Sequence, residues 1–451
     1  MLLRHLLHGF ALCAGALLVG CAPEVRVASA ENFRAQINAL ADSKRSQYEQ
    51  NPTQIVEEMR PSAQSSASLA PLPALADPNP STSTPVPEPT PIVSAPIPVP
   101  TQSQRTQTFA ALADEVARNR EELSTTEEGA RKIQEVLRTY VSEQWGDSDA
   151  QTATQTLFVK YTNHYKNRAT IDFEKGVVHV ETLETENPKE ALQKAIVATL
   201  LAPFNPDGIE ITNDSDIHIG ARPYLADYVR DNEGKEILYE WRANRYAQHL
   251  IANNLQKSQH GDKELWRVSL EMQKDYPEIQ NAQYGEIVNR YAKQHNLDPA
   301  LVLGIIKTES SFNPYATSKA PAYGLMQVVP STAGADAHEQ IHNKKGKPTA
   351  KMLYVPETNI QYGTTYLNIL GTRYLKGVRD PQSLEYCMIA AYNAGAGAVL
   401  QTFSSDRTQA IAQINQKTPQ EIYTILHTKL ASLEGRRYLQ KVTTAKKSFA
   451  K

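Results

Sequence analysis

The chain has 451 residues, which is enough for two or three domains of ordinary size. Its formal net charge of −2 provides no basic field that would attract nucleic acid, and no nucleic-acid-binding motif occurs, so we exclude that class of partner. The three cysteines, Cys13, Cys21 and Cys387, are too few for a disulfide framework. A small disulfide-stapled fold is therefore excluded as well.

The N-terminus is typical of a bacterial lipoprotein. Residues 1–20 contain the basic Arg4 and then a mostly apolar run, which is the layout of a secretory signal peptide. The last residues before and including Cys21 resemble the lipoprotein signal, in which the cysteine is acylated and becomes the mature N-terminus. An ordinary signal peptide with a chance cysteine is the alternative. Because Ala22 is not the Asp that retains many lipoproteins in the inner membrane, the resemblance implies a lipid anchor in the outer membrane, facing the periplasm.

Two polar segments follow the signal peptide. Residues 21–60 carry the anchor and have room for one or two short helices. Residues 61–107 are dense in Pro, Ser and Thr and lack apolar periodicity, so they cannot bury enough surface to fold. We interpret them as an extended tether, which at about 3.1 Å per residue would span roughly 100 Å. A tether suits an enzyme that works away from its membrane, although an inert spacer would have the same composition.

Residues 108–275 indicate a mixed α+β domain. Apolar positions from 133 to 141 have helical spacing, and the run 188–201 predicts another helix. Residues 169–183 alternate around a turn at 174–176, which predicts a β-hairpin. No catalytic constellation occurs here. This domain would have an accessory role, and glycan, envelope protein partners and the catalytic domain itself all stay open as its binding partners.

Residues 276–451 predict a compact domain made only of helices. The apolar spacing is helical throughout, and short loops rich in Gly, Pro and Asn separate the helices. The length is that of one ordinary domain. The whole chain is therefore expected to be an α+β multi-domain protein, with the mixed domain ahead of the all-α domain.

One carboxylate, Glu309, stands alone near the end of an apolar helix. No other Asp or Glu occurs between Pro299 and Ala335. The helix begins with Asp298 as its N-cap and is apolar nearly all round, so it should be buried. Burial and the helix C-terminus both disfavour the charged form of Glu309. A glutamate kept neutral at about pH 6–7 suits a general acid, whereas an exposed glutamate at a frayed helix end is the alternative.

The segments around Glu309 resemble the catalytic motifs of lytic murein transglycosylases with an SLT domain. The matching segments are "ESSFNPYATSKAPAYGLMQVVPSTAG" from residue 309, "AYNAG" from residue 391 and "EGRRYLQKV" from residue 434. Their order and spacing agree with the family over residues 276–451. Within the family, the motifs are most similar to those of membrane-bound lytic murein transglycosylase C, a subfamily with a lipid anchor and an N-terminal accessory domain. The long proline-rich tether departs from that pattern.

The resemblance implies a helical, goose-type-lysozyme-like catalytic domain that acts on peptidoglycan glycan strands. Glu309 would protonate the leaving oxygen of the MurNAc–GlcNAc bond, while the MurNAc acetamido group supports the oxocarbenium-like centre. The Glu309 carboxylate would then take a proton from the C6 hydroxyl, which closes a 1,6-anhydro ring. One carboxylate would thus serve as acid and then as base, and the reaction needs no cofactor.

The resemblance also supplies substrate-binding positions. They are Ser318, Gln327, Tyr392, Asn393 and Tyr438. The first two match sugar-binding positions of the family, and the next two would orient the acetamido group and the acid. Tyr438 would form a hydrogen bond near the catalytic carboxyl.

Three alternatives stay open at this point. "HEQIH" at residues 338–342 fits the H-E-x-x-H pattern of zinc proteases, but the segment is short and polar, so we expect no metal site. A muramidase that uses water in place of the C6 hydroxyl is a second alternative. The third is a lipoprotein that binds peptidoglycan without cleaving it.

Overall fold

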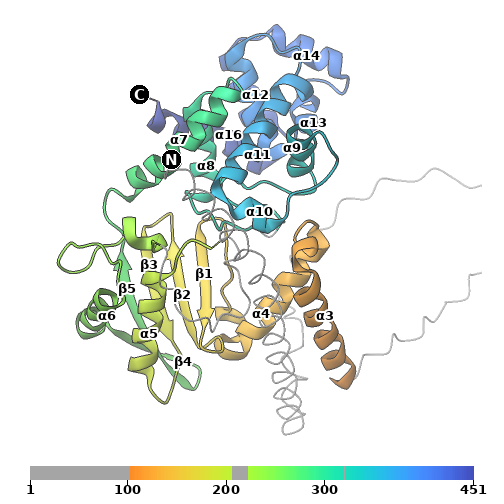
Figure 1. Ribbon diagram of the computed structural model, residues 1–451. Coiled ribbons are helices and arrows are strands. Elements are labelled where there is room, and N and C mark those ends of the chain that lie inside the picture. The colour runs from red at the N-terminus through yellow and green to blue at the C-terminus, as the bar shows by residue number, and fades with distance from the viewer. Residues whose placement is uncertain (1–101, 206–221, 319, 451) are drawn as a thin grey trace, which may run out of the picture. The chain divides into compact units, whose positions relative to one another are not determined.

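The computed structural model describes residues 102–205, 222–318 and 320–450 (Figure 1). The predicted signal peptide, the lipid anchor at Cys21 and nearly all of the predicted tether lie outside these residues. No helix within the described ranges is both long and apolar enough to cross a membrane.

The chain divides into two compact units, residues 1–117 and residues 118–451. Helix α3 (Gln102–Leu123) runs across this division, and its backbone leaves the helical conformation at Asn119. Residues 102–107, which were predicted as the last part of an extended tether, belong to this helix, so that part of the prediction is wrong. Every contact discussed below lies within the second unit.

Residues 118–275, the sheet region, contain a five-stranded antiparallel sheet in the order β1-β2-β3-β5-β4. The strands are β1 (Leu157–Thr162), β2 (Asn167–Asp172), β3 (Val177–Thr182), β4 (Gln256–His260) and β5 (Lys263–Glu271). Strands β2 and β3 form the predicted hairpin, and Gly176 in its turn has a φ of 68°. That left-handed conformation favours glycine.

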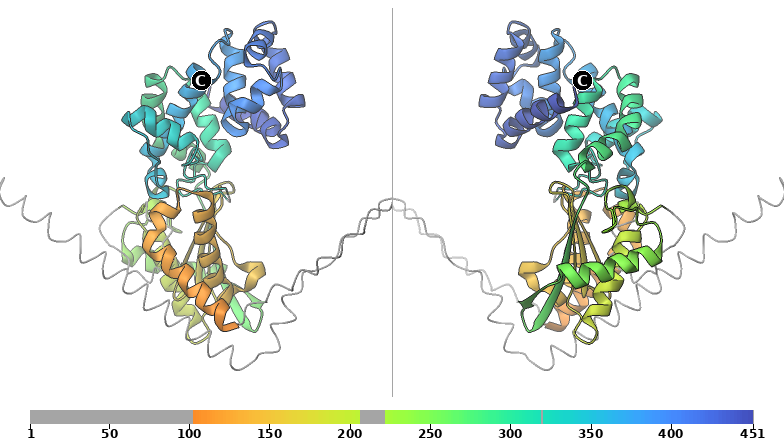
Figure 2. Two further views of the ribbon diagram at one scale, coloured as in Figure 1. Left: turned by 90° about the vertical axis from the view of Figure 1, so that its right-hand side faces the viewer. Right: turned by 90° about the vertical axis from the view of Figure 1, so that its left-hand side faces the viewer.

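Helices cover both faces of the sheet. They are α4 (Glu127–Asp149), α5 (Pro188–Leu201), the short 3₁₀ helix η1 (Tyr224–Asp227) and α6 (Glu240–Asn254). Successive strand residues point to opposite faces, so Phe158 joins the core under α5 and α6, while Tyr161 packs with Trp145 of α4. In the right-hand view of Figure 2 the sheet is seen close to edge-on, with α5 and α6 on its right-hand side.

Residues 276–450, the helical region, form an all-helical bundle around one hydrophobic core. The elements are α7 (Tyr276–Gln294), α8 (Pro299–Ser310), α9 (Ala333–His342), α10 (Ala350–Tyr354), α11 (Pro356–Ile369), the π-helical turn η2 (Leu370–Tyr374), α12 (Pro381–Ala394), α13 (Ala396–Gln401), α14 (Arg407–Asn415), α15 (Pro419–Lys429) and α16 (Leu433–Phe449). The predicted fold class, a mixed region followed by an all-α region, is confirmed.

Helix α8 runs through the centre of this bundle. Asp298 caps its N-terminus by accepting a hydrogen bond of 2.9 Å from the backbone N–H of Ala300. A Cβ atom added at Gly304 would lie 2.9 Å from the backbone nitrogen of Lys446 in α16, so the two helices approach closely. An ion pair of 2.8 Å between Lys446 and Asp298 joins the same helices. These contacts fix α8, the helix that carries Glu309, against α16.

Candidate active site

Glu309 lies on the last turn of α8, and only 8% of it is exposed. The helix ends immediately afterwards because Ser311 and Phe312 have φ values of 49° and 63°, in the left-handed region. The backbone turns sharply at these two residues and enters the loop of residues 311–328, which we call the site loop. Helix α8 therefore places an acidic side chain at the base of a tightly folded loop.

Burial raises the pKa of Glu309 to about 8, because the ionised carboxylate loses its hydration. The Tyr438 hydroxyl acts in the opposite direction and lowers the pKa, while the nearby Glu434 carboxylate adds to the rise. A glutamate in this setting is protonated at neutral pH. It can therefore donate a proton, as the sequence predicted from its position on an apolar helix.

Two tyrosines belong to the surroundings of Glu309. Burial, together with the charge of Glu309, raises the pKa of Tyr392 from α12 and of Tyr438 from α16 well above 10. The Tyr438 hydroxyl is buried and has no hydrogen bond of ordinary geometry to any residue within the described ranges. It nevertheless lies close enough to Glu309 to lower the pKa of that carboxyl. The hydroxyl is thus free to donate to Glu309 when the carboxyl ionises.

Tyr392 and Asn393 bond to protein groups rather than to Glu309. The Tyr392 hydroxyl donates to the carbonyl oxygen of Met326 at 2.8 Å and so connects α12 to the site loop. The Asn393 amide donates to Glu434 Oε1 at 3.2 Å. Asn393 therefore bonds to the carboxylate that contributes to the pKa of Glu309, and among the described residues no hydrogen bond joins it to Glu309 itself.

The second half of the site loop is hydrogen-bonded to the helical bundle by side chains that the sequence analysis did not identify. Ser310 Oγ donates to the carbonyl of Leu325 at 2.8 Å. Asn359, which is fully buried on α11, donates to the carbonyls of Tyr323 and Leu353 at 2.7 Å each and accepts from the N–H of Met326 at 2.7 Å. Neither residue carries a local sequence signal, since their partners are distant along the chain.

Gln327 and Ser318 both lie on the site loop. Gln327 has a φ of 47°, and its Nε2 donates to the carbonyls of Ala316 and Gly324 at 3.0 and 3.1 Å. Its buried Oε1 finds no partner within the described residues. Ser318 Oγ accepts from the N–H of Ala322 at 3.2 Å, so its hydroxyl supports the loop. Among the described residues, no hydrogen bond joins either side chain to Glu309.

The "HEQIH" segment is the C-terminal half of α9, and its two histidines belong to a small hydrogen-bonded group. His338 Nδ1 and His342 Nε2 lie 2.9 and 3.1 Å from the hydroxyl of Tyr362. Neither ring is paired with a carboxylate in these contacts. Within the part of the chain that the structure describes, no three His, Cys, Asp or Glu side chains are grouped as a metal site.

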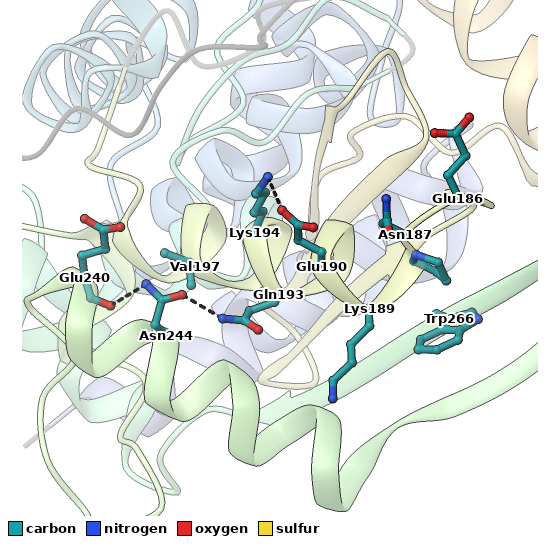
Figure 3. Close-up of a pocket in the computed structure, with 11 residues that line it drawn as sticks. Glu186, Asn187, Lys189, Glu190, Gln193, Lys194, Val197, Glu240, Asn244 and Trp266 are labelled. Carbon is teal, nitrogen blue, oxygen red and sulfur yellow. Dashed lines mark hydrogen bonds and ion pairs between the residues drawn. The ribbon is translucent and has the colours of Figure 1, made fainter.

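A separate cavity of about 620 Å³ lies in the sheet region, between α5, α6 and β5 (Figure 3). Gln193, Asn244 and Trp266 line it together with several lysines and glutamates, and the Gln193 amide donates to Asn244 at 3.0 Å. None of its lining residues comes from the helical region that holds Glu309. The cavity is therefore distinct from the candidate active site.

Two family descriptions match the chain in adjacent ranges. "Membrane-bound lytic murein transglycosylase C, N-terminal domain" matches residues 117–283, and "Transglycosylase SLT domain" matches residues 286–415. The second range contains Glu309 and the entire site loop. The fold, the candidate active site around Glu309 and the two family matches together define the class of the protein as a lytic transglycosylase with an SLT domain.

Curated relatives narrow this class. The chain is 41% identical over 306 residues to membrane-bound lytic murein transglycosylase C of Photorhabdus laumondii and of Serratia proteamaculans, and 40% identical to that of Klebsiella pneumoniae. Each alignment covers 68% of this chain and 85% of the relative. The chain belongs to the membrane-bound lytic murein transglycosylase C family and is a lytic transglycosylase.

Two solved structures show partial similarity. A lytic transglycosylase Slt mutant from Pseudomonas aeruginosa is 25% identical with a TM-score of 0.27, and the 70 kDa soluble lytic transglycosylase from Escherichia coli is 24% identical with a TM-score of 0.28. Each match covers 36% of this chain and only 23% of the other. These similarities are too partial to support a conclusion about fold or activity.

Proposed function

We propose that this enzyme cleaves the β-1,4 bond between MurNAc and GlcNAc in peptidoglycan without water and leaves 1,6-anhydro-MurNAc ends. The observation that carries the proposal is the buried carboxyl of Glu309, whose pKa is raised to about 8. The names of the relatives, which are murein transglycosylases, support peptidoglycan as the substrate. The same group that donates a proton at neutral pH can take one back after the bond breaks.

One carboxyl group, that of Glu309, carries out both proton transfers of the proposed reaction. Glu309 gives its proton to the leaving glycosidic oxygen as the bond from that oxygen to C1 breaks, and the substrate's acetamido oxygen supports the positive charge at C1. The C6 hydroxyl then forms the new C1–O6 bond and passes its proton to the Glu309 carboxylate. Between these steps the carboxylate is buried and charged, and the nearby Tyr438 hydroxyl, which has no hydrogen bond of ordinary geometry to any described residue, is available to stabilise it.

The remaining site residues are proposed to bind or support the substrate. Gln327 has a buried Oε1 with no partner among the described residues, and a sugar N–H or O–H group that reaches this atom would satisfy it. Tyr392 holds the site loop through Met326, so its role would be to position that loop. Asn393 is exposed enough to contact an acetamido group, and Ser318 lies on the first half of the loop.

We further propose the placement of the enzyme in the cell envelope. Acylated Cys21 would anchor it to the outer membrane, facing the periplasm, and residues 61–107 would extend it toward the peptidoglycan layer. Residues 108–275 would be the accessory domain and residues 276–451 the catalytic domain. The relatives described as membrane-bound support an envelope location, while the anchor lies outside the described residues.

A hydrolytic muramidase is the second candidate, and one observation favours it. Glu434 is close enough to contribute to the pKa of Glu309, so a second carboxylate is present near the acid. Hydrolases use such a second group to activate water or to attack the sugar. Glu434, however, is exposed and accepts a hydrogen bond from Asn393 at 3.2 Å.

The test is mass spectrometry of the products released from purified sacculi. Wild type should release anhydro-muropeptides, which are one water lighter than reducing-end products, and Glu434→Gln should release the same species. Glu309→Gln should fold and release nothing, because an amide cannot donate the proton. The matched control is Glu339→Gln, which removes an exposed carboxylate from α9 and should leave activity unchanged. Reducing-end products from wild type would establish the hydrolase instead.

A further inference from the structure

An aromatic side chain of the site loop lies in the hydrophobic core of the sheet region. Tyr315 is only 4% exposed and belongs to the core beneath α5 and α6. Its ring centroid lies 4.6 Å from that of Phe158 and 5.3 Å from that of Phe204. Its hydroxyl accepts a hydrogen bond of 2.9 Å from the backbone N–H of Asn205. Tyr315 thus joins the active-site side of the molecule to a core built by a different part of the chain.

Neighbouring residues of the loop are joined to the sheet region as well. The fully buried Asn313 donates from Nδ2 to the carbonyl of Gln155 at 3.2 Å. The backbone N–H of Thr317 donates to the carbonyl of Thr154 at 3.2 Å. The first half of the site loop is therefore held by the sheet region, whereas Asn359 and Ser310 hold the second half from the helical region.

Ala316 connects the two halves. Its carbonyl accepts from the backbone N–H of Gly324 at 2.9 Å and from Gln327 Nε2 at 3.0 Å. Ala316 directly follows Tyr315 in the chain, so a shift of the Tyr315 backbone moves an acceptor that orients the Gln327 amide. A short covalent and hydrogen-bonded path thus leads from the core of the sheet region to Gln327.

We propose that Tyr315 is a positioning residue through which the sheet region holds Gln327 in its substrate-binding orientation. This inference deepens the proposed function, since it rests on Gln327 contacting the sugar. A loop held at both ends loses less conformational entropy when substrate binds, and its groups stay near the productive geometry. Among the described residues, no hydrogen bond or ring contact joins Tyr315 to Glu309 or to the α12 and α16 tyrosines, so its removal should affect binding of substrate and leave the acid unchanged.

The test measures kcat, KM and the pH profile of full-length variants on soluble glycan strands. Tyr315→Ala should lower kcat/KM about tenfold, mostly through KM, because Gln327 loses its fixed orientation. The pH at which activity falls on the alkaline side should match that of wild type. Tyr315→Phe keeps the packing and loses only one acceptor, so it should remain within about threefold of wild type.

The matched control is Tyr246→Ala, because Tyr246 is a buried tyrosine of the same core, on α6, with its ring stacked on His249. It should lower the melting temperature comparably and leave KM unchanged. If either alanine variant fails to fold, Tyr315→Leu and Tyr246→Leu replace the pair.

A double mutant separates positioning from simple destabilisation. Gln327→Ala and the Tyr315→Ala/Gln327→Ala double variant should have nearly equal kcat/KM values, because both changes act on the same contact. Additive losses, or equal KM increases in the Tyr315 and Tyr246 variants, would overturn the proposal. Failure of the proposed function would appear separately, as reducing-end products from wild type.

Discussion

Burying the Glu309 carboxyl costs the folded protein free energy once that carboxyl ionises. Its pKa rises from an ordinary value of 4.5 to about 8 on folding, with loss of hydration as the main cause. A raised folded-state pKa means that the group's contribution to stability is fully present below pH 4.5 and is lost as the pH rises toward 8. At the residue scale, the burial that keeps Glu309 protonated therefore lowers the stability of the folded protein near and above neutral pH.

This cost predicts a stability difference between wild type and Glu309→Gln that depends on pH. The amide cannot ionise, so the variant should be more stable than wild type at pH 8.5 by a few kcal/mol, with a smaller gap at pH 5. Wild-type activity should fall as the pH rises through about 8, because the acid loses its proton. Denaturant unfolding at both pH values measures the gap, with the exposed Glu339→Gln as control, and a gap that is the same at both would contradict the prediction.

At the scale of elements, the site loop depends on residues that are far apart in the sequence. Periodicity predicted the helix at residues 188–201, which is α5, and it also predicted the buried helix that carries Glu309. It did not indicate Asn359, whose Nδ2 bonds to the carbonyl of Tyr323, 36 residues away. Nor did it indicate that Tyr315 would bond to Asn205, 110 residues away. Local spacing reports which face of a helix is buried and contains no information on such partners.

The backbone turn at Gly324 predicts that adding one methyl group at this residue strongly lowers stability. Its φ is 74°, and an added Cβ would lie 2.2 Å from the carbonyl oxygen of Leu353 and 2.3 Å from Asn359 Nδ2. Gly324→Ala should therefore disrupt the loop and destabilise the protein by roughly 2–4 kcal/mol, because both neighbours are fixed. Activity should fall with it, since the loop carries Gln327.

Gly285→Ala is the matched control for that change. Gly285 lies inside α7 with an ordinary backbone conformation and nothing within 4 Å of an added Cβ. Alanine there should stabilise the protein by about 0.5–1 kcal/mol through its higher helix propensity. Thermal unfolding of both variants decides the matter, and equal melting temperatures would show that the Gly324 turn tolerates a side chain.

At the scale of the whole molecule, the sheet region cannot be separated from the site by simple truncation. Strand β5 pairs with β3 across a long insertion that contains α5 and α6, and the resulting core encloses Tyr315 of the site loop. The predicted hairpin accounted for β2 and β3 alone, because pairing across such an insertion leaves no local pattern. Removing the sheet region would therefore expose Tyr315, the Asn313 side-chain amide that bonds to Gln155 and the Thr317 N–H that bonds to Thr154.

The last prediction concerns reach, which the proline-rich segment 61–107 would provide. Deleting residues 61–101, the part of it that precedes α3, should leave activity on soluble glycan strands unchanged, because the contacts described above that hold Glu309 and the site loop come from residues 118–451. Activity of the membrane-anchored protein on intact sacculi should fall, since a shorter chain cannot bring the site to a distant layer. Cys21→Ala provides the comparison: it should release the protein from membranes, and in the deletion variant it should restore activity on sacculi by removing the need for reach. Equal losses on both substrates would mean that residues 61–101 support the fold and do not act as a tether.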